Sequence, residues 1–184
     1  MIDKIIKPPP SVKAVKKLDD WPEWEASIKN ELDIHKLLKT GVLVKPLLNV
    51  NIIGSQLNLC YKLDKDGKIS SPKSQLIAQG FTQQEGIDFT YTFSPTAKLT
   101  AVRIIAAIAV QNNWELEQTD VDAAYLNASL KEDIYMHQLK GFEEPGQEDK
   151  VIHLKREIYG LRKSGCEWYA DLMHTLTSVG FKQC

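Results

Sequence analysis

The chain has 184 residues, of which 43% are hydrophobic and 26% charged, so it is long and apolar enough to form a packed core. The net charge of −1 excludes a general electrostatic attraction to nucleic acid but leaves room for a local basic groove. The longest unbroken apolar stretch, Ile104–Val110, is far too short for a membrane span, which needs about 20 residues. The three cysteines are far apart and are expected to be free thiols in a reducing compartment.

The N-terminal third predicts a leader and a helix. Residues 1–17 are basic and proline-containing, and we expect them to be a flexible leader to a single domain over residues 18–184. Asp20 is the predicted N-cap of a helix with Pro22 in its first turn, and Gly41 is its predicted end. The apolar stripe of this helix is Trp24, Ile28, Leu32 and the Leu37–Leu38 pair.

A β-hairpin is predicted next. Apolar and polar residues alternate from Gln56 to Leu63, the pattern of a half-buried strand. Asp66–Gly67 favours a tight turn, and the return strand is expected within Ser71–Phe81. The turn is not an EF-hand loop, because the closing Glu is missing.

The remaining elements mix helices and strands. A helix capped by Thr100 is predicted to bury Leu99, Val102, Ala106, Ala109 and Val110. Strands are predicted over Trp114–Val121, over Ile134–Gln138 and after residue 150, and a Ser164–Glu167 capping box is expected to open a last helix. Because strands and helices do not alternate strictly, we predict an α+β fold.

Asp120 and Asp122 stand two residues apart at the end of a predicted strand. Magnesium prefers hard oxygen ligands and often takes only one or two protein carboxylates, so the pair could hold a divalent cation. Acidic residues are also common at strand ends, and the spacing alone does not decide between the two interpretations.

Five ordered blocks between Trp21 and Phe181 resemble the N-terminal half of a copia-type LTR-retrotransposon reverse transcriptase, an RNA-directed DNA polymerase. They read DWPEWEASIKNELDIHKLLKTG, YKLDKDGKI, LIAQGFTQQEGIDFTYTFSPTAKLTAVRIIAAIAVQNNWELEQTDVDAAYLN, DIYMHQLKGF and IYGLRKSGCEWY. The resemblance implies a right-handed polymerase fold, of which this chain would supply the fingers and an incomplete palm. It further implies Mg²⁺ as cofactor, a template–primer and deoxynucleoside triphosphates as partners, and an intracellular location in the cytoplasm, the nucleus or a virus-like particle.

The resemblance also assigns residue roles. Asp120 matches the first catalytic aspartate, a metal ligand together with the Val121 carbonyl, whereas Asp122 is expected to be a solvated neighbour. The expected nucleotide-binding residues are Lys73, Tyr125, Tyr159 and Gly160. The expected nucleic-acid contacts are Lys155, Arg156, Arg162 and Lys163.

Some family features have no counterpart in the sequence. The second metal motif, an Asp-Asp hairpin, is expected after the final block, yet the one adjacent Asp pair is Asp19–Asp20. Gln75 replaces a usual Arg in the triphosphate site, and Ala128 replaces a usual Gly in a turn. We therefore expect a fragment without the Asp-Asp hairpin, thumb and RNase H region, inactive alone and complemented by the missing C-terminal half. The alternatives are a non-catalytic nucleic-acid-binding or polymerase-interfering remnant, and a degenerate element without a selected function.

Overall fold

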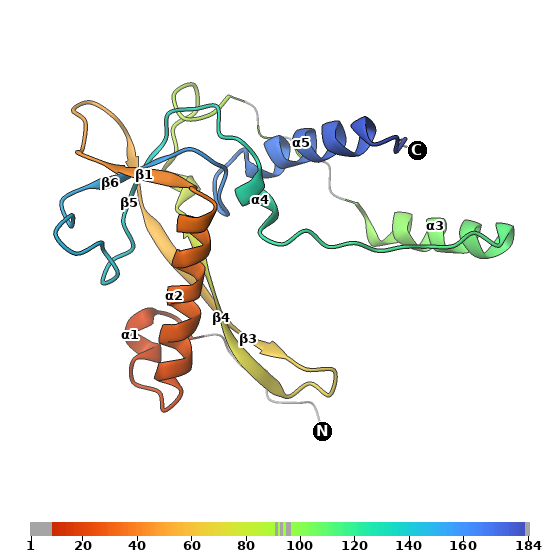
Figure 1. The fold of residues 1–184 in the computed structure, drawn as a ribbon, viewed down its shortest axis with the longest axis horizontal. Helices are drawn as coiled ribbons and strands as arrows, with labels where there is room; N and C mark the ends of the chain where they lie inside the picture. Colours follow the sequence, from red (N-terminus) through yellow and green to blue (C-terminus); the bar gives the residue numbers. More distant parts are fainter. Residues whose placement is uncertain (1–8, 91, 93, 95–96, 183–184) are drawn as a thin grey trace.

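The computed structural model describes residues 9–90, 92, 94 and 97–182, and it mixes helices and strands without strict alternation (Figure 1). The helices are α1 (Val12–Val15), α2 (Trp21–Leu37), the 3₁₀ turn η1 (Gly80–Thr82), α3 (Leu99–Asn112), α4 (Ala124–Asn127) and α5 (Ser164–Ser178). The strands are β1 (Gly41–Val44), β2 (Ile52–Ile53), β3 (Ser55–Leu63), β4 (Ile69–Ala78), β5 (Tyr135–His137) and β6 (Val151–Leu154). This agrees with the predicted mixture of α and β structure.

The leader differs from the prediction where the structure describes it. Ser11 caps α1 by accepting a hydrogen bond from the Ala14 N–H at 3.3 Å. Val15 is fully buried against Trp24 and Leu59, so this part of the leader packs on the domain instead of remaining flexible. Residues 1–8 lie outside the described residues, and the domain boundary near residue 18 stays a prediction.

Helix α2 confirms the predicted helix and its start, with Asp20 at the N-cap position and Pro22 in the first turn, but not its predicted end. Asp20 makes no side-chain cap, because its Oδ2 accepts a hydrogen bond from the Tyr61 hydroxyl at 2.8 Å. The helix ends at Leu37, and Lys39, with φ of 51°, reverses the chain in place of Gly41.

The β3–β4 hairpin forms as predicted. Asp64 Oδ1 accepts hydrogen bonds from the N–H groups of Asp66 and Lys68, both at 2.9 Å. Gly67 has a φ of 77°, the left-handed conformation that a glycine adopts without a Cβ clash. These features close the turn and fix the register of two long antiparallel strands.

Helix α2 covers the edge of β4 that faces away from β3. The Ser74 N–H donates to Ser27 Oγ at 3.0 Å, and the Leu76 N–H donates to Glu31 Oε1 at 2.9 Å. Side chains one helical turn apart therefore satisfy alternate N–H groups of an edge strand, which would otherwise be exposed or unpaired.

A second sheet has the strand order β1-β6-β5-β2 and packs beside the hairpin. Strand β6 is antiparallel to both β1 and β5, and the short β2 is parallel to β5. The main core joins this sheet to α2, β4 and the segment before α5, and its fully buried members are Ile28, Ile53, Leu126, Met136 and Ile158.

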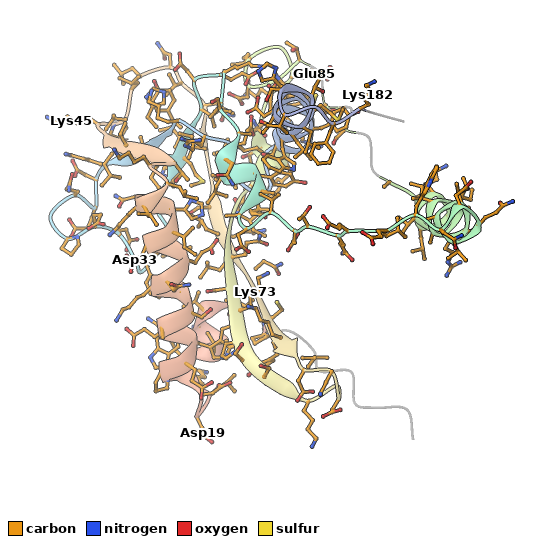
Figure 2. The ribbon with its side chains drawn as sticks, turned by 45° about the vertical axis from the view of Figure 1, so that its right-hand side comes forward. Asp19, Asp33, Lys45, Lys73, Glu85 and Lys182 are labelled. Carbon is orange, nitrogen blue, oxygen red and sulfur yellow. The ribbon has the colours of Figure 1, made fainter. Side chains whose placement is uncertain are left out.

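Helix α3 forms within the predicted range, but its surroundings differ from the prediction. Lys98, not Thr100, is its N-cap, and Ala109 is its one buried residue. Both views show α3 standing away from the rest of the chain, followed by an extended segment (Figures 1 and 2). The predicted strand over Trp114–Val121 does not form, because no strand of the described residues lies beside it to complete the backbone pairing.

Helix α5 forms where predicted but without the expected capping box. Ser164 is the first residue inside the helix, after Lys163 at the cap. Glu167 binds Lys131 and Lys163 instead of reaching back to the helix start. Cys60 and Cys166 are free thiols, as predicted, while Cys184 lies outside the described residues. Among the described residues, no helix has the length and apolarity that crossing a membrane requires.

Candidate functional site

A cleft of about 870 Å³ lies between α2, β4 and the turn that leads into α4. This volume suits a nucleotide-sized ligand, since small-molecule sites are commonly about 300–1,000 Å³. Among the lining residues are Lys73, Gln75, Asp122 and Tyr159, which come from three separate parts of the sequence. The expected nucleotide-binding residues Lys73 and Tyr159 are thus brought together.

Lys73 and Lys62 are the two cations that line the cleft among the described residues, and Lys73 is the one on β4. It lies on β4 in the middle of the hairpin (Figure 2) and is exposed, and it forms no ion pair with any described acidic residue. Gln75, two residues further along the same strand, adds a neutral amide that binds an anion more weakly than an Arg would. An anionic ligand would therefore meet one unpaired cation on the β4 wall.

The turn before α4 carries the two carboxylates. Asp120, Val121 and Asp122 are all exposed, but Asp122 lines the cleft whereas Asp120 and Val121 do not. Asn127 Nδ2 donates to the carbonyl oxygens of Asp122 at 3.2 Å and Ala123 at 3.3 Å, which closes the turn. The structure therefore separates the two carboxylates by location and leaves their roles as predictions.

Backbone strain in this turn lies at Ala123 and not at Ala128. Ala123 has a φ of 49°, in the left-handed region that costs a residue with a Cβ roughly 1–2 kcal/mol. Ala128 has an extended backbone with φ of −79° and is fully buried. The replacement of the usual Gly by Ala128 therefore causes no backbone strain, because the positive φ of this segment lies at Ala123.

Two tyrosine rings lie against each other in a tilted arrangement, and of the two only Tyr159 lines the cleft. The ring centroids of Tyr125 and Tyr159 are 4.7 Å apart at an interplanar angle of 51°. Burial raises the pKa of Tyr159, and the nearby Tyr125, Glu31 and Asp120 raise it further. Tyr159 therefore remains a neutral hydroxyl at physiological pH.

Gly160 lets the chain pass close to β4. Its φ is 91°, and a Cβ at this position would overlap the Ala78 carbonyl oxygen and the Ile77 side chain. The Ala78 N–H donates to the Tyr159 carbonyl at 2.8 Å, so the Tyr159–Gly160 turn continues the hydrogen bonding along the edge of β4. Gly80 packs equally closely, since a Cβ there would overlap the Gly160 carbonyl oxygen.

Two of the four expected nucleic-acid contacts lie near the surface of the β6–α5 connection. Lys155 is exposed, with its Nζ 3.4 Å from His153 Nε2. Arg156 is half-buried and donates from Nη1 to the Asn127 carbonyl at 3.0 Å. Lys155 is accordingly free of acidic partners among the described residues, while Arg156 braces the end of α4.

The other two expected contacts, the exposed Arg162 and the half-buried Lys163, are bound to other groups of the protein. Arg162 donates from Nε to the Gly80 carbonyl at 3.1 Å. Lys163 binds Glu132 at 2.5 Å and Glu167 at 2.9 Å. Burial alone would lower the pKa of Lys163, but these two hydrogen bonds raise it. The charge of Lys163 is therefore already neutralised by protein carboxylates.

The described residues contain no cluster of three or more His, Cys, Asp or Glu side chains that could hold a metal ion by itself. The Asp120 carboxylate and the Val121 carbonyl are hard oxygen donors in a solvated place, the kind that Mg²⁺ accepts together with water and substrate oxygens. The donor chemistry suits magnesium, but further ligands must complete the shell.

Sequence reasoning missed three residues around the cleft. Ser27 and Glu31 support β4 from α2, and Glu157 is buried behind the Tyr159–Gly160 turn. The i,i+4 spacing of Ser27 and Glu31 was visible, but polar residues at that spacing more often face solvent. Glu157 had no sequence signal, since a single Glu beside basic residues indicates a surface position.

Comparison with known proteins gives a consistent set of relatives. The family model described as reverse transcriptase (RNA-dependent DNA polymerase) matches residues 38–184. A retrovirus-related Pol polyprotein from transposon RE2 of Arabidopsis thaliana is 34% identical over 176 residues, 95% of this chain and 12% of the relative. The Pol polyprotein from transposon TNT 1-94 of Nicotiana tabacum is 42% identical over 111 residues, 59% of this chain and 8% of the relative.

A shorter relative also matches. An uncharacterised mitochondrial protein of Arabidopsis thaliana is 39% identical over 90 residues, 49% of this chain and 53% of that protein. The chain spans 12% of the length of the RE2 polyprotein, so it corresponds to a small part of such relatives. No solved structure matches the chain.

Proposed function

The chain belongs to the reverse transcriptase family of copia-type retrotransposons, and from this premise we propose that it forms the nucleotide-binding part of an RNA-directed DNA polymerase. The β3–β4 hairpin and α2 would be its fingers, and the sheet with the Asp120 turn would be the first part of its palm. The observation that carries the proposal is the cleft between α2, β4 and α4, which gathers Lys73, Asp122 and Tyr159.

Different residues around the cleft would contact different parts of a bound deoxynucleoside triphosphate. Lys73 would bind phosphate oxygens from the β4 wall, because it is exposed and has no described acidic partner. Tyr125, whose ring lies tilted against that of Tyr159, would form the apolar surface beneath the sugar and exclude a 2′-hydroxyl by its bulk. Gly160 would let the Tyr159 turn approach β4 without a side chain between them.

Asp120 and the Val121 carbonyl would hold a divalent cation, which the reverse transcriptase family generally uses. When bound, such an ion supplies charge stabilisation for the attacking and leaving oxygens of phosphoryl transfer. Asp120 is exposed, so its carboxylate would be accessible to a cation from solvent. Further carboxylates from a partner polypeptide or a longer chain would complete the shell.

Template and primer would be the macromolecular partners. Lys155 is the one expected contact that is both exposed and free of a carbonyl or carboxylate partner among the described residues. With a net charge of −1 and few such cations, binding of nucleic acid by this chain alone is expected to be weak and salt-sensitive.

A chimeric polymerase tests the proposal. The segment of the RE2 polyprotein that aligns with this chain would be replaced by residues 1–184, and primer extension on an RNA template would be measured. We expect extension by the chimera, a loss of about a hundredfold or more in Asp120→Asn, and a much smaller loss in Asp122→Asn. The 184-residue polypeptide alone is expected to give no extension.

The two Asp variants are matched controls, because they make the same chemical change two residues apart. Loss of activity in Asp122→Asn with activity kept in Asp120→Asn would reassign the catalytic carboxylate to the residue that lines the cleft. Failure of the chimera to extend any primer, while remaining folded, would contradict the proposed function.

A further inference from the structure

Glu157 is a fully buried acid two residues before Tyr159, which lines the cleft. Its Oε2 lies 2.7 Å from Ser164 Oγ, and its Oε1 has no hydrogen-bond partner among the described residues. A buried carboxylate without a cationic partner or several donors is costly. The surroundings therefore favour a neutral side chain.

The hydrogen bonds of Ser164 identify where the proton is. Ser164 Oγ lies 2.6 Å from the Ile158 carbonyl oxygen as well as 2.7 Å from Glu157 Oε2. A hydroxyl has a single proton, and a carbonyl oxygen can only accept. With Glu157 ionised, the single Ser164 proton can serve only one of the two acceptors. Both short contacts are hydrogen bonds at the same time when Ser164 donates to the Ile158 carbonyl and a protonated Glu157 donates to Ser164 Oγ.

The neighbouring charges do not supply a counterion. Lys163 is bound to Glu132 and Glu167, and Lys131 is bound to Glu167, so these two cations are matched by two carboxylates. Burial raises the pKa of Glu157 to about 7; the Ser164 hydroxyl and the Lys163 charge lower it, while Glu132 and Glu167 raise it.

We propose that Glu157 is held as a neutral carboxylic acid whose proton positions the Tyr159–Gly160 turn through Ser164 and the Ile158 carbonyl. The importance of this turn for substrate rests on the function proposed above. When Glu157 ionises, it can no longer donate a hydrogen bond to Ser164 Oγ, and the series of hydrogen bonds from Glu157 through Ser164 to the Ile158 carbonyl is broken. The turn, and the Ala78 hydrogen bond to the Tyr159 carbonyl, should then loosen.

The sign of the pH effect follows from the protons bound. The unfolded chain releases the Glu157 proton near the ordinary pKa of 4.5, while the folded chain keeps it to about pH 7. Between these values the folded state binds more protons, so stability falls as pH rises, and above about pH 7 this contribution is lost.

The test compares the chain with Glu157→Gln, whose amide N–H can donate to Ser164 Oγ at every pH. We expect equal stability to urea at pH 5 and a gain for the variant that grows to pH 8, where its unfolding equilibrium constant is lower by on the order of a hundredfold. Hydrogen exchange of the Ala78 amide should speed up with pH in the original chain by more than the intrinsic exchange rate of an unprotected amide does. In Glu157→Gln the increase should match the intrinsic rate. The exposed Glu85→Gln is the matched control and should follow the original profile.

Parallel pH profiles of the original chain and Glu157→Gln would overturn the proposal. If Glu157→Gln does not fold, carboxyl ¹³C NMR of the unsubstituted chain decides: a midpoint near 7 supports the proposal and a midpoint near 4.5 overturns it. These readouts measure folding and local opening without polymerisation, so their failure and a failure of the chimera are distinguishable.

Discussion

At the scale of single residues, the candidate site depends on positions where a side chain has little freedom. Gly160 is placed against the Ala78 carbonyl, and Ala123 accepts a left-handed backbone so that Asp122 can face the cleft. The backbone conformation at Gly160 therefore fixes the position of Tyr159, and the backbone conformation at Ala123 fixes the position of Asp122.

Gly160→Ala should destabilise the chain by roughly 3 kcal/mol or more, because a left-handed backbone and an overlap with Ala78 act together. Gly67→Ala is the matched control, since Gly67 has a similar positive φ of 77° with nothing within 4 Å of a Cβ. It should cost only about 1–2 kcal/mol. Urea unfolding of both variants measures the difference, and equal losses would show that the close approach to β4 is unimportant.

At the scale of secondary-structure elements, α2 and β4 act as one unit. Ser27 and Glu31 bond the outward N–H groups of β4, and the Tyr159 carbonyl bonds the next one, at Ala78. The edge strand that carries Lys73 is thereby fixed on both sides. A rigid wall is what a binding cation needs for precise placement of an anion.

Glu31→Ala should cost about 1–3 kcal/mol, because it leaves the N–H of the buried Leu76 without an acceptor. Glu31→Gln keeps an oxygen acceptor and should recover most of that loss. Glu25→Ala, which removes a largely exposed ion pair with Lys29, should change stability by less than about 0.5 kcal/mol. Denaturant unfolding and exchange of the Leu76 amide report the effect, and unchanged Leu76 protection in Glu31→Ala would contradict it.

At the scale of the whole molecule, α3 stands apart from both sheets in the part of the chain that the structure describes. Its apolar side chains are exposed, with Ile104 at 54% and Val110 at 78%, and both views show the helix apart from the two sheets. Arg103 is its one charged residue. Exposed apolar surface of this extent favours self-association of the isolated chain.

The double variant Ile104→Lys with Val110→Lys should reduce self-association, because it places two charges on the exposed helix without disturbing the core. The monomer fraction measured by sedimentation should rise, and the rise should be smaller at high salt, where the added charges are screened. The melting temperature should change by less than about 2 °C. Ala109→Lys is the control, since Ala109 is buried and its replacement should destabilise the chain. A large loss of stability in the double variant would show that α3 packs on the domain.

The sequence by itself determined the local elements and the family. Helix α2, the β3–β4 hairpin with its Asp64–Lys68 turn, and α5 all follow from short-range periodicity and turn chemistry. The ordered blocks identify the reverse transcriptase family, because they are spread over most of the chain. Such signals are read within a few residues or from motif order, so no tertiary contact is needed to detect them.

Only the tertiary structure decided which polar groups are internal. The Asp20 side chain at the N-cap of α2 binds Tyr61 instead of the first N–H groups of the helix. Lys163 binds carboxylates instead of remaining free for phosphate, and Glu157 is buried. In each case, the partner is brought in by packing from a distant part of the sequence or an adjoining turn. The same reason explains Trp114–Val121, which has a strand pattern but no neighbouring strand among the described residues. The role of a polar side chain depends on the cost of removing it from water and on the hydrogen-bond partners that offset this cost. Both are set only after the chain has folded.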